Sequence, residues 1–143
     1  MRILPALASR VILPVAVRNE LDAGRAKGVD LPVLADLPWL ETRAPVATPV
    51  LGMVTDLGPG ESEVIALALE DRQRVAILDD AVARRWARVV GIRFTGTLGL
   101  LIDAKNAGLI AEVRPVLDPW EAHRFRIDAS TRERVLRLVG ERP

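Results

Sequence analysis

Short apolar runs alternate with longer amphipathic segments along the chain. The apolar runs at residues 11–13, 75–78 and 92–94 have the length and composition of buried strands. Periodicity and turn residues predict helices over residues 14–21, 61–71, 80–90, 96–106, 115–123 and 130–139. Strands that alternate with helices predict an α/β fold with a mainly parallel sheet. In such folds ligands bind beyond the carboxyl ends of the strands, so a functional site is expected there.

Turn and capping residues support these boundaries. Gly58, Pro59 and Gly60 form a turn before the helix at 61–71, and Gly91 ends the helix at 80–90. Ser130 and Glu133 have the spacing of a capping box at the start of the last helix. Residues 28–50 are rich in proline, so any helix there is short and no element is assigned to them.

Glu61 interrupts the apolar side of the helix at 61–71. At about 100° per residue, Glu61 lies in line with Ile65 and Ala68, whereas Glu63 and Glu70 fall on the polar side. Two interpretations of Glu61 are open. An acid in the first turn complements the helix dipole, and an acid on an apolar face can also point into a cleft.

Asp79 and Asp80 follow the strand at 75–78 directly. One of them is expected to cap the next helix, and a second acid is not needed for that purpose. Asp80, Arg84 and Arg88 form a stripe with a spacing of four residues. A surface ion pair between Asp80 and Arg84, of little energetic value, is therefore the alternative to a functional role.

Three further polar residues lie near the ends of predicted elements. Glu20 borders the apolar side of the first helix, where its carboxylate either faces a site or is solvated through its flexible stem. Thr95 and Thr97 flank Gly96 after the strand at 92–94. Their hydroxyls could bind a phosphate or water, or they could cap the following helix.

The composition narrows the chemistry that these residues can perform. The chain has no Cys and one His, His123, whereas 19 of its residues are Asp or Glu. Disulfides, thiol nucleophiles and Cys-ligated metals are excluded, and a Ser-His-Asp triad would depend on His123 alone. The composition therefore favours a hard cation held by carboxylates, Mg2+ or Mn2+.

The positive charge is carried almost entirely by arginine. The 143 residues include 18 Arg and 2 Lys, and the segments 71–93 and 124–142 each carry a local charge of +3. Arginine suits bidentate contact with phosphate, although a GC-rich genome also explains an arginine excess. No apolar run approaches the roughly 18–20 residues that a membrane span needs, so a cytoplasmic protein without a membrane partner is expected.

Four stretches of the chain form a recognisable pattern together: VILPVAVRNEL, LGPGESEVIALALE, AILDDAVARRWARVVGIRFTGTLGLLIDAKNAGLI and HRFRIDASTRERVLRLVGE. They resemble PIN-domain proteins. More narrowly, they resemble a bacterial and archaeal branch predicted to bind nucleic acid, which is related to the VapC-type toxin ribonucleases. The resemblance runs from about Arg2 to Glu141, and the order and spacing of the pieces are more specific than any one of them.

This resemblance implies a three-layer α/β/α sandwich and cleavage of RNA by water that a Mg2+ or Mn2+ ion activates. Matched by position, the catalytic acids are Glu20, Glu61, Asp79 and Asp80. Glu61, Asp80 and Glu20 are then the expected metal ligands, with Asp80 the closer match of the two adjacent acids. The expected contacts to nucleic acid are Arg84, Arg88, Thr95 and Thr97. A small antitoxin protein and a homodimer are the other implied partners.

The beginning of the chain departs from the family pattern. PIN proteins begin with a strand that carries an Asp, whereas MRILPALASR matches the end of the helix that follows this strand. We therefore expect one PIN-like domain over residues 1–143, without the first strand and most of the first helix. A misassigned start, a truncation and a loss of catalysis are the three explanations. A VapC-like Mg2+- or Mn2+-dependent endoribonuclease is the favoured function, provided that a longer true protein supplies the missing Asp. A catalytically impaired module that binds nucleic acid or a partner is the alternative, and a small-molecule binder is a more distant third.

Overall fold

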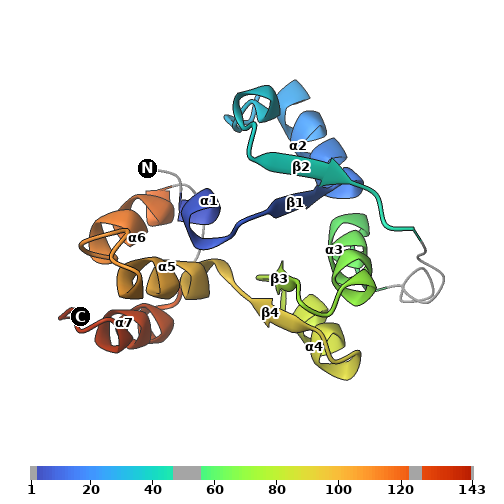
Figure 1. The fold of residues 1–143 in the computed structure, drawn as a ribbon. Helices are drawn as coiled ribbons and strands as arrows, with labels where there is room; N and C mark the ends of the chain where they lie inside the picture. The colour runs from blue at the N-terminus through green and yellow to red at the C-terminus, as the bar shows by residue number, and fades with distance from the viewer. Residues whose placement is uncertain (1–2, 47–55, 123–126, 143) are drawn as a thin grey trace. The chain divides into compact units, whose positions relative to one another are not determined.

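The computed structural model describes residues 3–46, 56–122 and 127–142, with the side chains of residues 121 and 122 excepted. Their contacts divide the chain into two compact units, one of residues 9–96 and one of residues 1–8 with 97–143 (Figure 1). Helices and short parallel strands alternate through the described residues, which confirms the predicted α/β class.

The first parallel pair in the unit of residues 9–96 joins β1 (Val11–Pro14) to β2 (Leu40–Arg43). Between them lie α2 (Val15–Ala26) and a short 3-10 helix, Leu34–Asp36. Pro14 ends the strand and serves as the N-cap residue of α2, as its fixed φ allows. The strand β2 was not predicted, because the prolines at 38 and 45 on either side of it obscure a run of only four residues.

The second parallel pair joins β3 (Val75–Ile77) to β4 (Arg93–Thr95) through α4 (Ala81–Val89). The Leu78 amide donates to the Thr95 carbonyl at 2.8 Å and extends the pairing by one residue. Gly91 turns the chain between α4 and β4 with φ of +70°, a conformation that favours glycine. In the described residues β1 and β3 therefore belong to separate two-stranded sheets, where a single sheet was expected.

The helix α3 (Pro59–Glu70) packs against elements of both sheets. It contacts β1 and β3 and the helices α2 and α4. Three of its buried residues form one core with residues of β3 and α4 and with the residues directly after β3 and before β4, namely Ile65, Ala66, Ala68, Ala76, Leu78, Ala83, Ala87 and Ile92. Five of these residues are alanine, whose small side chain lets backbones approach closely. The packing of α3 thus fixes its N-terminus near the end of β3.

The other unit is helical in its described part. It contains α1 (Ile3–Leu7), α5 (Thr97–Asn106), α6 (Arg114–Ala122) and α7 (Ala129–Leu138). Its core is formed by Leu101, Val113, Leu117, Val135 and Leu136. The helix α1 was not predicted from periodicity, but it lies where the family resemblance places the end of the first helix.

Asp128, and not Ser130, caps the last helix. The Asp128 carboxylate accepts hydrogen bonds from the Ser130 hydroxyl at 2.5 Å and the Thr131 amide at 2.9 Å. These donors lower the pKa of Asp128. Glu133 pairs with Arg137 at 3.0 Å, so the predicted capping box is wrong. Asp128 is as good a cap as Ser130, and it places the N-cap two residues earlier than predicted.

Glu141 ties the end of the chain to the start of α6. Its carboxylate accepts from the amides of Val113 at 2.7 Å and Arg114 at 3.0 Å, and lies 3.4 Å from Lys105 Nζ. Burial acts to raise the pKa of Glu141, but the two amides and Lys105 outweigh it and hold that pKa below its usual value. The charged carboxylate therefore stabilises the folded state.

We expect Glu141→Gln to lower the free energy of unfolding by about 1–3 kcal/mol at pH 7, because a charged acceptor is lost. The pKa of Glu141 is lower in the folded state than its unfolded value of about 4.5, so the carboxylate stabilises the folded state at pH values above 4.5. This stabilisation disappears as the pH falls through the folded-state pKa. The difference between wild type and variant should therefore shrink from pH 7 to pH 3 in urea titrations. Glu133→Gln, at an exposed pair, is the control. A difference independent of pH would contradict this role.

Candidate active site

Four acids from three elements line one hollow in the unit of residues 9–96. The hollow has a volume of about 230 Å³ and is open to solvent on one side. Its acids are Glu20 of α2, Glu61 of α3, and Asp79 and Asp80 after β3, and Val17, Val64 and Ile77 are among its apolar lining. The four candidates that were chosen from the sequence therefore share one surface depression at the carboxyl end of β3.

Asp80 is the N-cap of α4. Its backbone is extended, and its Oδ1 accepts a hydrogen bond from the Ala83 amide at 2.8 Å. This bond uses one of the two carboxylate oxygens and fixes the orientation of the other. A capping role and a role in the hollow are therefore compatible for Asp80.

Asp79 pairs with Arg84. The Arg84 Nη2 lies 3.4 Å from Asp79 Oδ1, and Arg84 Nε donates to the Leu78 carbonyl at 2.7 Å. The spacing of four residues suggested a pair between Asp80 and Arg84, and that interpretation is wrong. Because the Asp80 carboxylate caps the N-terminus of α4, Arg84 pairs instead with Asp79, the preceding residue.

Glu20 is held by the N-terminus of α3. Its Oε1 accepts from the Gly60 amide at 3.2 Å. A Cβ at residue 60 would lie 3.0 Å from both carboxylate oxygens of Glu20 and 3.1 Å from Val17 Cγ2. Gly60 thus permits a close approach that a larger residue would disturb. The sequence placed Gly60 in a turn but did not show that it faces a residue forty positions earlier.

Glu61 lies in the first turn of α3 and folds back over Gly58, the N-cap residue of that helix. A Cβ at residue 58 would lie 2.5 Å from Glu61 Oε2. The carboxylate therefore lies beside the positive end of the helix and also lines the hollow. Both interpretations of this acid hold in the structure.

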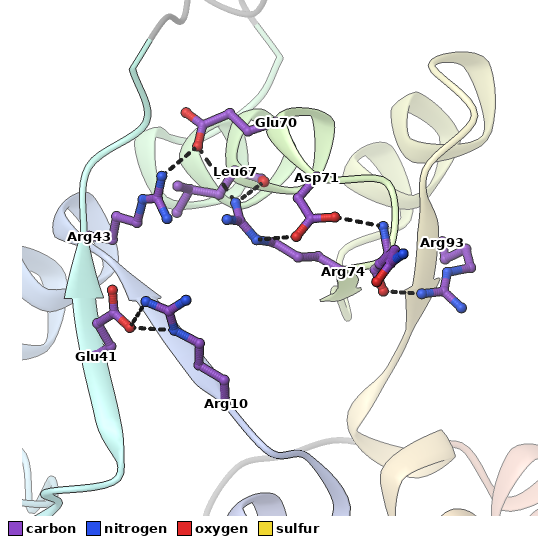
Figure 2. Close-up of polar contacts among 9 residues, drawn as sticks. Arg10, Glu41, Arg43, Leu67, Glu70, Asp71, Arg74 and Arg93 are labelled. Carbon is purple, nitrogen blue, oxygen red and sulfur yellow. Dashed lines mark hydrogen bonds and ion pairs between the residues drawn. The ribbon is translucent and has the colours of Figure 1, made fainter.

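Glu63 and Glu70 were expected on a solvated side, and both make specific contacts. The Glu63 carboxylate accepts from the Ala16 amide at 2.8 Å and so satisfies a donor in the first turn of α2. Glu70 accepts from the Val46 amide at 2.6 Å and lies between Arg43 and Arg74, at 3.5 and 3.6 Å (Figure 2). Long-range contacts of this kind are not encoded in helical periodicity.

Many arginines of the basic segment at 71–93 are used within the fold. Arg72 donates to the carbonyls of Val90 and Gly91, and Arg74 donates to that of Leu67. Figure 2 also shows the contact between Arg93 and the Gln73 carbonyl. These arginines stabilise turns and helix ends, so the local charge of this segment is a weaker indication of nucleic-acid binding than its sum suggests.

The other predicted contacts to nucleic acid have different surroundings. Arg88 lies over the ring of Phe94, 5.2 Å from its centroid, in a cation–π arrangement. The Thr95 hydroxyl, at the end of β4, donates to the Gly96 carbonyl at 3.4 Å. Thr97 is the first residue of α5 and belongs to the other unit. His123 lies outside the described residues.

The donor set of the hollow is chemically suited to a hard divalent cation. All four acids offer carboxylate oxygens, the ligands that Mg2+ and Mn2+ prefer, and like charges so close together favour an added cation. As they are placed, no three acid or imidazole side chains of the described part of the chain converge on a single metal position. A metal ion held by three of these acids would therefore require movement of their side chains.

Gly60 and Glu20 should be coupled energetically. Because an alanine methyl would press on the Glu20 carboxylate, we expect Gly60→Ala to cost more in wild type than in the Glu20→Ala background, by about 0.5–1 kcal/mol. Urea denaturation of the two single variants and the double variant measures this coupling. Effects that add to within about 0.3 kcal/mol would contradict the contact.

The comparisons with known proteins place the chain in a family. A family model described as a PIN domain matches residues 1–141. No curated protein and no solved structure gives a significant match. In the described residues, no helix is both long and apolar enough to cross a bilayer. PIN domains are generally nucleases, and they typically use divalent metals and act on nucleic acid. Because the match covers nearly the whole chain, this protein belongs to the PIN-domain family.

Proposed function

We propose that this protein is a metal-dependent ribonuclease of the VapC-like toxin type, which hydrolyses RNA phosphodiesters. The observation that carries the proposal is the hollow into which α2, α3 and the end of β3 bring Glu20, Glu61, Asp79 and Asp80. Membership of the PIN-domain family supports it.

Glu61, Asp80 and Glu20 would hold the cation. When bound, Mg2+ or Mn2+ would supply an activated water and neutralise charge on the phosphate. The chain prepares the site by fixing Asp80 and Glu20 through one oxygen each, which limits the freedom of the other oxygen. Asp79 adds negative charge at the same strand end, and Arg84 holds it there. Preorganised groups of this kind need little rearrangement during the reaction.

Contacts to the RNA would come from Arg88, Thr95 and Thr97. Arg88 is exposed on α4, and its guanidinium keeps edges available for phosphate while one face covers Phe94. Thr95 presents a hydroxyl at the carboxyl end of β4, the end at which ligands bind in parallel sheets. Thr97 follows two residues later, at the start of α5.

A module that binds RNA or a protein without cleaving is the second candidate. It is favoured by the structural use of the acids, because Asp80 caps a helix, Asp79 pairs with Arg84, and Glu20 accepts from a backbone amide. Residues with these roles could be needed for folding alone. Cleavage assays with variants that keep the structural contacts separate the two candidates.

Asp80→Asn removes the charge but keeps the cap, since Asn and Asp cap helices about equally well. We expect this variant to lose about 10²–10³-fold in the rate of Mn2+-dependent RNA cleavage, with an unchanged melting temperature. Asp128→Asn makes the same exchange at the cap of α7 and should keep the wild-type rate. Glu61→Gln should resemble Asp80→Asn.

Equal rates in wild type, Asp80→Asn and Glu61→Gln would place the activity elsewhere. If the wild type binds RNA but does not cleave it with either metal, the non-catalytic module is the correct description. A folded wild type that neither binds nor cleaves RNA would contradict the ribonuclease and the RNA-binding module, and would leave a protein-binding module.

We also propose that the edge of β3 is covered by a partner, either a second copy of the chain or a small antitoxin. Val75 and Ile77, on one side of this strand, are 50% and 37% exposed, and in the described residues β3 pairs only with β4. Exposed strand edges with apolar residues are prone to pairing.

Light scattering tests the first of these partners. A dimer should have twice the monomer mass of 15.6 kDa, and Val75→Lys should shift the equilibrium toward monomer because it places a charge on the strand. A wild-type protein that remains monomeric at high concentration would contradict the homodimer.

A further inference from the structure

The Arg84 side chain spans the ends of two strands. Its Nε donates to the carbonyl of Leu78, directly after β3, at 2.7 Å, and its Nη2 reaches Asp79 Oδ1 at 3.4 Å. Leu78 is itself bonded to Thr95 at the end of β4, at 2.8 Å. The guanidinium therefore ties the first turn of α4 to the point where both strands end.

Gly96 makes room for this guanidinium. A Cβ at residue 96 would overlap Arg84 Nη2 and would lie 2.9 Å from Asp79 Oδ1. Gly96 is not among the described glycines with a positive φ, so the conformation does not require glycine there. The requirement is the close approach of Arg84 and Asp79 to the backbone.

We propose that Arg84 is a positioning residue of the carboxylate site and not a contact for RNA phosphate. It orients the Asp79 carboxylate and fixes the turn that carries Asp80, while Gly96 supplies the space it needs. This inference rests on the proposed function and changes the role that the sequence suggested for Arg84. Its positive charge also offsets part of the repulsion among the acids of the hollow.

Lysine cannot replace arginine in this role. The planar guanidinium directs separate donors to the Leu78 carbonyl and the Asp79 carboxylate, whereas an ammonium group is a single point on a flexible stem. A phosphate contact, in contrast, is largely retained by lysine, because most of its contribution comes from charge. The two roles of Arg84 therefore predict opposite results for Arg84→Lys.

The first measurement is Mn2+ binding, followed through the electron paramagnetic resonance signal of the free ion. A positioning role predicts that Arg84→Lys weakens Mn2+ binding by about 10–100-fold, the usual effect of removing a group that orients ligands. Gly96→Ala should have a similar effect, because its methyl displaces the guanidinium while the charge at residue 84 remains. Circular dichroism checks whether both variants are folded at the temperature of the titration. If Gly96→Ala is unfolded, the result for Arg84→Lys alone decides the question.

The second measurement is the salt dependence of RNA binding. Loss of one phosphate contact reduces the slope of log K against log salt by about 0.7–0.9. Arg84→Ala should leave this slope unchanged, whereas Arg88→Ala should reduce it and so provides the matched comparison on the same helix.

The outcomes separate this inference from the proposed function. Weaker Mn2+ binding by Arg84→Lys, together with an unchanged salt slope in Arg84→Ala, supports the positioning role. Wild-type Mn2+ binding by Arg84→Lys, or a reduced slope in Arg84→Ala, overturns it and leaves the metal site intact. If the wild-type protein binds no Mn2+, the proposed function and the positioning role both fail.

Discussion

The crowding of negative charge at the carboxyl end of β3 is the constraint on which the site depends. Four carboxylates line one small hollow, and each must be stabilised in its charged form if all are to remain there. The fold does this with dipoles and one cation. The N-terminus of α3 donates to Glu20, the N-terminus of α4 is capped by Asp80, and Arg84 pairs with Asp79. The same contacts fix the positions of these acids, so stability and preorganisation have a common origin.

Packing explains how these acids come together from distant parts of the sequence. The alanines of α3, β3 and α4 allow a tight core around Ile65, and this core sets the N-terminus of α3 beside the end of β3. Glu63 then reaches back to the first turn of α2, the helix that carries Glu20. A larger residue at position 60 would disturb the approach of α2 to α3. The hollow is therefore a property of the packing of α2, α3 and β3 and not of any one of them.

The sequence predicted the individual helices, strands and site acids better than the tertiary contacts between them. Alternation of apolar runs and turn residues located β1, β3 and α3 to within about two residues, and periodicity singled out Glu61. The strand β2 was missed because it lies between prolines, and the partners of Glu63 and Gly60 lie 47 and 40 residues away. Such contacts depend on tertiary packing, which local sequence patterns do not predict. The same limit applies to Arg84, because the composition counts arginines without showing which of them contact carbonyls and carboxylates of the chain.

The most direct test of the account is the position of a bound metal ion. Crystals of the protein soaked in Mn2+ would locate the ion through its anomalous scattering. If these acids bind the ion, one strong peak lies inside the hollow, with carboxylate oxygens of Glu61, Asp80 and Glu20 as its ligands from the chain, and crystals of Asp80→Asn show no such peak there. A peak elsewhere, or an empty hollow at saturating Mn2+, would contradict the central claim that these acids form a metal-binding active site.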